Sequence, residues 1–135
     1  MKQRVADIVA SFLVNQGIKD IFSLTGGGAM FLNDGIASNS DINAIFNHHE
    51  QACAMGAVAY AKYKNGLSAA MLTTGCGSTN AITGLLDAWQ DNTPVIFISG
   101  QIKRKETSRN AQTNLRQFGV QEAGIVSIVE PLTKY

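Results

Sequence analysis

Cysteine, proline and unbalanced charge are all scarce in this sequence. Two cysteines in 135 residues are too few for a disulfide-stabilised scaffold, so we expect free thiols in a reducing, cytoplasmic compartment. Eleven Lys and Arg residues oppose ten Asp and Glu residues, which leaves a formal net charge of +1. Because this balance provides little attraction to phosphate backbones or anionic lipids, we expect neither nucleic acid nor a membrane as a partner.

Long apolar runs are lacking as well. No run approaches the roughly 18 residues that a membrane-spanning helix needs. The apolar stretch after Lys2 and Arg4 is interrupted by Asp7 and has the periodicity of an amphipathic helix, which argues against a signal peptide. The chain is nevertheless 45% hydrophobic and 16% charged, so it can form a core, and its length predicts one domain.

Strand-like apolar runs alternate with segments of helical periodicity along the chain. A first helix ends at Gly17. We then expect strands over 18–25, 42–46, 68–74 and 95–99, and helices over 29–37, 51–63 and 81–89. This order predicts the α/β class, with a doubly wound parallel sheet of at least four strands and helices on both faces.

Three further segments have predictions of their own. The nearly unbroken apolar run Val95–Ser99 is typical of a strand covered on both faces. Residues 75–80 predict a tight loop, and 103–110, which contain no core residue, predict a solvated loop. Residues 121–129 predict a last helix that Pro131 stops.

Polar and glycine-rich motifs follow each of the four predicted strands. They are Gly26–Gly28, His49–Glu50, Gly75–Asn80 and Gly100–Gln101. Ligands of open α/β sheets bind at this carboxyl edge, where loops pass into helices. Neither glycine loop has the spacing of a dinucleotide fingerprint or of a phosphate-binding P-loop. Glycine at such a turn also has a purely structural use, because it adopts a positive φ and allows a close backbone approach.

The run from His49 to Cys53 resembles the zinc-binding pattern H-E-x-x-H, with Cys53 in place of the second histidine. A catalytic zinc needs a third protein ligand, and only His48 and Cys76 remain for that role. The plainer interpretation is that His48 and His49 cap the helix or form hydrogen bonds.

Glu50 stands at the start of an apolar helix, at the mouth of the predicted sheet. A carboxylate there is partly desolvated, which suits a group that holds or shares a proton. The alternative is a structural one, in which an acidic residue interacts favourably with the dipole at the helix N-terminus.

Five segments in order resemble the pyrimidine-binding domain of thiamine-diphosphate-dependent enzymes of the acetolactate synthase (acetohydroxyacid synthase) type. The segments are Phe22–Gly27, His49–Ala61, Thr74–Asn80, Asp91–Gln101 with Pro94, and Gln121–Glu122 with Pro131–Tyr135. Together they span nearly the whole chain. The resemblance therefore implies the thiamine-diphosphate-binding fold for residues 1–135, as an N-terminal domain that is incomplete at its C-terminus.

The resemblance also implies roles for individual residues. Glu50 corresponds to the catalytic glutamate whose carboxyl group hydrogen-bonds the pyrimidine ring of the cofactor, so that C2 of the thiazolium loses its proton. Gln121 corresponds to a glutamine on the substrate side, facing the reacting carbonyl. The cofactor-binding residues implied by the resemblance are Gly26, Gly27, Glu50, Thr74, Gly75, Gly77 and Asn80.

The implied activity is that of a 2-keto acid decarboxylase or carboligase. Thiamine diphosphate is its cofactor, and some relatives also bind FAD. Mg²⁺ would be held by a diphosphate-binding domain with a Gly-Asp-Gly motif and a later Asn-Asn pair, neither of which occurs here. That domain belongs to another subunit or to the rest of the chain, so we expect a homodimer or homotetramer and an inactive isolated fragment. A non-catalytic nucleotide- or metal-binding module is the alternative function.

The expected partner leaves two interpretations open for four apolar residues. Met30, Phe31, Met55 and Tyr60 belong either to the subunit interface or to the core.

Two segments differ from the family pattern. Gly75-Cys76-Gly77 stands where the family usually has Gly-Pro-Gly, and Val120–Gly124 stands where it has Phe-Gln-Glu-x-Asp, so that Val120 replaces a phenylalanine beside the substrate pocket. Both differences concern the substrate, and they admit a resemblance to the related enzymes associated with bacterial surface sugars.

Overall fold

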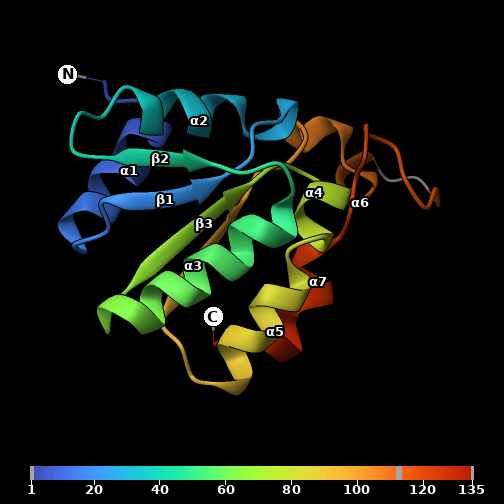
Figure 1. The fold of residues 1–135 in the computed structure, drawn as a ribbon. Helices are drawn as coiled ribbons and strands as arrows, with labels where there is room; N and C mark the ends of the chain where they lie inside the picture. The colour runs from blue at the N-terminus through green and yellow to red at the C-terminus, as the bar shows by residue number, and fades with distance from the viewer. Residues whose placement is uncertain (1, 112–113, 135) are drawn as a thin grey trace.

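A four-stranded, entirely parallel sheet forms the centre of the computed structural model, which describes residues 2–111 and 114–134 (Figure 1). The strands are β1 (Asp20–Ser23), β2 (Asn43–Phe46), β3 (Ser68–Leu72) and β4 (Val95–Ser99), in the spatial order β2-β1-β3-β4. Ile21 pairs with Ala44 on one side and with Ala69 on the other. The predicted doubly wound parallel sheet is thus confirmed.

Helices cover both faces of this sheet (Figure 1). One face carries α1 (Val5–Asn15) and α2 (Met30–Ala37), and the other carries α3 (Glu50–Lys64) and α5 (Ile82–Gln90). The remaining elements are short: η1 (Gly27–Ala29), α4 (Cys76–Thr79), η2 (Arg104–Glu106), α6 (Ser108–Ala111), α7 (Ile125–Val129) and η3 (Glu130–Leu132).

Two apolar clusters hold these layers together. Under α1 and α2, the side chains of Leu13, Ile21 and Met71 are no more than 1% exposed to solvent. Under α3 and α5, Cys53 and Leu72 are buried among alanines. Small residues at these helix positions let α3 and α5 approach the sheet and each other closely.

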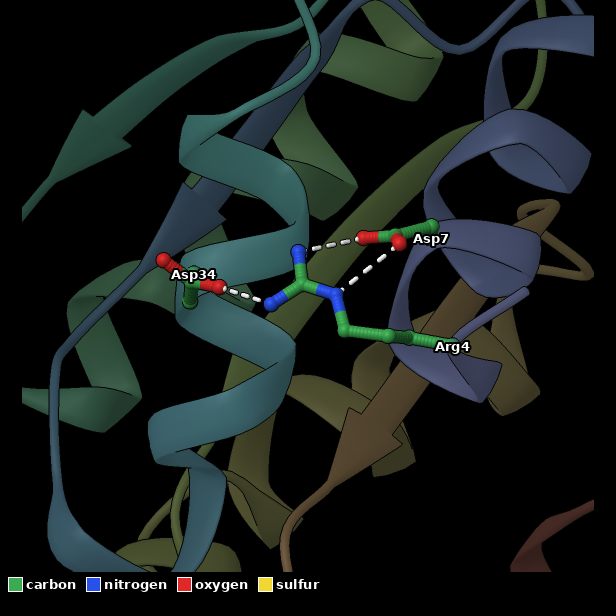
Figure 2. A network of polar contacts seen from close by, with 3 residues as sticks. All are labelled: Arg4, Asp7 and Asp34. Atoms are coloured by element: carbon green, nitrogen blue, oxygen red, sulfur yellow. Dashed lines mark hydrogen bonds and ion pairs between the residues drawn. The ribbon is translucent and has the colours of Figure 1, made fainter. Parts of the chain in front are cut away.

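A charged network joins α1 to α2 at the surface (Figure 2). Nε and Nη2 of Arg4 donate to the two carboxylate oxygens of Asp7, at 2.9 and 2.6 Å, and Nη1 donates to Asp34 of α2. The hydrogen bonds from Arg4 lower the pKa of Asp7. Because all three groups are accessible to water, the network orients the two helices more than it stabilises the fold.

Three of the predicted segments differ in the structure. Residues 75–80 contain the helical turn α4, and 103–110 contain η2 and the turn of α6, whose Asn110 N–H donates to Thr107 Oγ1 at 3.3 Å. The helix predicted over 121–129 does not begin at Gln121, because this residue has a φ of 53°, which a right-handed helix does not admit. The helix α7 begins only at Ile125.

The fourth strand also differs from its prediction. Val95–Ser99 was expected to be covered on both faces, but within the described residues β4 is an edge strand and all five of its residues are half-buried. In the part of the chain that the structure describes, β4 pairs with β3 alone.

No helix within residues 2–111 and 114–134 is long and apolar enough to cross a membrane. Tyr135, the last residue of the fifth family-like segment, lies outside the described residues.

Candidate functional site

The chain leaves two neighbouring strands in opposite directions. From β1 it passes outward to β2, and from β3 it passes outward to β4. The loops that follow β1 and β3 therefore diverge at the carboxyl edge of the sheet, which is where doubly wound folds bind ligands. Gly26–Gly28 follow β1 at this edge, and Thr73–Gly77 follow β3.

Glu50 is the first residue of α3, and it reaches this edge from the end of β2. His49 is the N-cap of the helix, and its Nδ1 accepts a hydrogen bond from the Gln51 N–H at 3.1 Å. The capping interpretation of His49 is thus confirmed. This cap fixes where α3 begins and so fixes the position of the half-buried Glu50 side chain.

The Glu50 carboxylate is held on one side only. Asn80 Nδ2 donates to its Oε2 at 2.9 Å, whereas Oε1 accepts no hydrogen bond from any described residue. A Cβ atom placed on Gly77 would lie 3.3 Å from Oε1 and 2.5 Å from Thr73 Cγ2. Because Gly77 has no side chain, Glu50 Oε1 and the Thr73 methyl group can both lie close to the loop backbone.

The spacing between Glu50 and Asn80 depends on a close helix contact one turn further on. A Cβ atom on Gly84 of α5 would lie 2.6 Å from the Cβ of Ala54 in α3. Ala54 follows Glu50 by about one turn of α3, and Gly84 follows Asn80, which lies in the turn between α4 and α5, by four positions. The small residues at this crossing therefore set the distance at which Asn80 meets Glu50.

Thr73 links the two glycine loops. Its Oγ1 accepts a hydrogen bond from the Gly28 N–H at 3.1 Å, and its side chain lies where Cβ atoms on Gly26 and Gly77 would be. Gly27 is exposed, and a Cβ there would have no neighbour within 4 Å. Gly26 and Gly77 thus flank Thr73, while Gly27 faces open space.

Thr74 and Gly75 connect the loop after β3 to Gln101 and Gln121. The Thr74 side chain is buried, and its hydroxyl donates to Gln101 Oε1 at 2.9 Å. Gly75 has a φ of 63°, and a Cβ atom on it would lie 1.8 Å from the carbonyl oxygen of Gln121. Only glycine fits this contact, which brings Gln121 to the same edge of the sheet.

The predicted site residues therefore lie together at the carboxyl edge. Glu50, Gly77 and Asn80 form one group, which Gly26 joins through Thr73, and Gly75 contacts Gln121. Sequence reasoning missed Thr73, although its place directly after β3 is a usable signal. It also assigned no role to the Gln101 and Glu122 side chains, whose partners are distant in sequence.

The alternative metal site is not assembled among the described residues. No group of three His, Cys, Asp or Glu side chains within 2–111 and 114–134 lies close enough to hold a metal ion. Both cysteines are free thiols: Cys53 is buried, and burial raises the pKa of its thiol, while Cys76 is exposed.

The geometry thus presents a carboxylate with one oxygen held by Asn80 and the other without a hydrogen bond from any described residue. Such a group can hold or exchange a proton.

Comparison with known proteins identifies the family of the chain. Residues 3–120 match the family model described as thiamine pyrophosphate enzyme, N-terminal TPP binding domain. The acetolactate synthase large subunits of Lactococcus lactis and of Buchnera aphidicola from Schizaphis graminum are 33% and 32% identical over 96% of this chain and 21% of their own length. The chloroplastic acetolactate synthase of Arabidopsis thaliana is 31% identical over 96% of this chain and 18% of its own length.

The chain spans about a fifth of the length of these relatives. The matches favour the resemblance to acetolactate synthases over the nucleotide- or metal-binding module, and the family's cofactor is thiamine diphosphate. The chain belongs to the thiamine pyrophosphate enzymes, and it corresponds to their N-terminal cofactor-binding domain.

Proposed function

We propose that the full-length protein is a thiamine-diphosphate-dependent 2-keto acid decarboxylase or carboligase of the acetolactate synthase type. One observation carries the proposal: Glu50 has one carboxylate oxygen held by Asn80, while the other accepts no hydrogen bond from a described residue and lies next to Gly77 at the carboxyl edge of the sheet. Bound thiamine diphosphate would supply the carbon nucleophile and the electron sink for cleaving a 2-keto acid.

The residues present fit the pyrimidine half of this cofactor. Glycine at positions 26 and 77 lets both loops pack directly on Thr73, and the space beside the neighbouring Gly27 is open. Glu50 Oε1 would share a proton with a ring nitrogen, and the hydrogen bond from Asn80 would keep the carboxyl plane turned toward the ring. Gln121, placed against Gly75, would face the substrate.

The diphosphate half of the cofactor needs ligands from elsewhere. Mg²⁺ is bound through carboxylate and amide oxygens and phosphate, and the chain has no Gly-Asp-Gly motif with a later Asn-Asn pair. We therefore assign Mg²⁺ to a diphosphate-binding domain of another subunit or of the remaining chain. Some enzymes of the resembled type also bind FAD, which is the candidate second cofactor.

The two free thiols favour a reducing compartment such as the cytoplasm.

Exposed apolar side chains support such a partner. Met30, Phe31 and Met55 are 60%, 72% and 43% exposed, so they are available for an interface and are not core residues. Tyr60 differs, because it is half-buried against Phe22 and its hydroxyl donates to Asp20 Oδ2 at 2.6 Å. We propose that the first three contact a second subunit in a homodimer or homotetramer.

Turnover of a 2-keto acid tests the proposed activity. The full-length protein with thiamine diphosphate and Mg²⁺ should release carbon dioxide from pyruvate or a longer 2-keto acid. Glu50→Gln should lower the rate by about 100-fold or more, because the amide cannot transfer the proton. Wild-type turnover in this variant, or no turnover of any 2-keto acid by the unmodified enzyme, would contradict the proposal.

A further inference from the structure

Gln121 has a backbone conformation that few residues other than glycine adopt. Its φ is 53°, and its carbonyl oxygen lies against Gly75, whose own φ is 63°. A left-handed conformation is unfavourable for a residue with a side chain, because its Cβ comes too close to the following carbonyl oxygen. The surrounding structure must therefore hold Gln121 in place.

The side chain of the next residue, Glu122, accepts four hydrogen bonds that restrain the turn around Gln121. Its Oε1 accepts hydrogen bonds from the N–H and the hydroxyl of Ser108, at 2.7 and 2.8 Å. Its Oε2 accepts from the N–H groups of Phe118 and Gly119, at 3.0 and 3.4 Å. One carboxylate thus ties the start of α6 to the turn that precedes Gln121.

A second restraint acts on the other side of Gln121. Gln101 Nε2 donates to the carbonyl of Ala123 at 3.3 Å, while Gln101 Oε1 accepts from the Thr74 hydroxyl. Gly119 packs closely on Ile102, since a Cβ there would lie 2.0 Å from the Ile102 Cδ1. The turn 118–123 is therefore fixed to the end of β3 and to the segment after β4.

We propose that Glu122 is a positioning residue, which holds Gln121 against Gly75 at the carboxyl edge of the sheet. This inference rests on the proposed function and adds a division of roles within it. Glu50 and Asn80 act on the cofactor, whereas Glu122 acts through Gln121 on the approach of the 2-keto acid. Removal of the Glu122 charge should therefore affect substrate handling and leave the proton chemistry at the cofactor intact.

The test compares Glu122→Gln with the control Glu130→Gln, an exposed carboxylate in η3, in the full-length enzyme with thiamine diphosphate and Mg²⁺. In Glu122→Gln, kcat/KM for the 2-keto acid should fall by about 10-fold to 100-fold, because the substrate-side group is misplaced. Exchange of the cofactor C2 proton, measured without substrate, should stay within about twofold of the unmodified enzyme. Ser108→Ala, which removes one of the four hydrogen bonds, should give a smaller change in the same direction.

Two further readouts separate positioning from a general loss of structure. Amide hydrogen exchange at Phe118 and Gly119 should become faster in Glu122→Gln while the strands stay protected. In a Gln121→Ala background, Glu122→Gln should change kcat/KM by less than about twofold, because the two side chains act as one unit.

Different results overturn different claims. Unchanged kcat/KM in Glu122→Gln, or an additive loss in the double variant, would overturn the positioning role of Glu122. Loss of C2 exchange in Glu122→Gln would also overturn it, because the division of roles would be wrong. Absence of C2 exchange in the unmodified enzyme would overturn the proposed function itself, and this inference with it.

Discussion

Gly75 is the residue on which the substrate side of the site depends most closely. Gly75→Ala would place a Cβ 1.8 Å from the Gln121 carbonyl oxygen at a φ of 63°. We expect a loss of about 1–3 kcal/mol in the free energy of unfolding, from overpacking and backbone strain. Urea denaturation would measure it.

Gly27→Ala is the matched control for this substitution. A Cβ at Gly27 has no neighbour within 4 Å, so the change should be within about 0.5 kcal/mol of neutral. Equal losses in the two variants would show that the Gly75 contact has no special importance.

Glu122 has a pKa below its ordinary value, because the Phe118 N–H and then the Ser108 and Gly119 groups donate to its carboxylate. A depressed pKa in the folded state means that the stabilisation is present above about pH 4.5 and is lost as the pH falls through the folded value. The midpoint of the Glu122 carboxyl titration, followed by carbon-13 NMR, should therefore lie below pH 4.5. Titration at or above that pH would show that these hydrogen bonds are not made in solution.

At the scale of elements, the crossing of α3 and α5 sets the distance between Glu50 and Asn80. Gly84→Ala would push α5 away from Ala54, so we expect about 1–3 kcal/mol of destabilisation. In the full-length enzyme it should also slow turnover, because Asn80 would no longer meet Glu50.

Thr83→Ala, at an exposed neighbouring position on α5, is the control and should be neutral or slightly stabilising. Thermal unfolding and turnover of both variants would check this. Wild-type activity in Gly84→Ala would separate the helix crossing from the site.

The regular elements were predictable because their signals are local. Apolar periodicity located the four strands and the four longer helices to within a few residues. The helix predicted from Gln121 failed because the conformation of that residue is set by Gly75, Ser108 and Gln101, which are distant in sequence.

The site was predictable in part for the same reason. A parallel sheet brings the carboxyl ends of its strands together, so motifs after each strand identified Glu50, Gly77 and Asn80. Their assignment to a cofactor site required the family resemblance. The hydrogen bond between Asn80 and Glu50 and the place of Thr73 between two loops required coordinates, because these residues are distant in sequence.

At the scale of the whole molecule, we propose that the chain provides one half of a cofactor site. Isolated residues 1–135 should bind thiamine diphosphate weakly or not at all in the presence of Mg²⁺, because we assign the ligands for the diphosphate and its metal to another domain. Titration calorimetry, with light scattering for the mass, would measure this. Micromolar binding by a monomer would contradict the partnership that we propose.

The central claim is that Glu50 governs proton exchange at the cofactor, and exchange of the C2 proton tests it most directly. NMR would follow the exchange of C2 in the full-length enzyme without substrate, for the unmodified protein, Glu50→Gln and the control Glu130→Gln. We predict that Glu50→Gln slows the exchange by about 100-fold or more and that Glu130→Gln leaves it unchanged. Exchange at the unmodified rate in a folded Glu50→Gln protein would contradict the account.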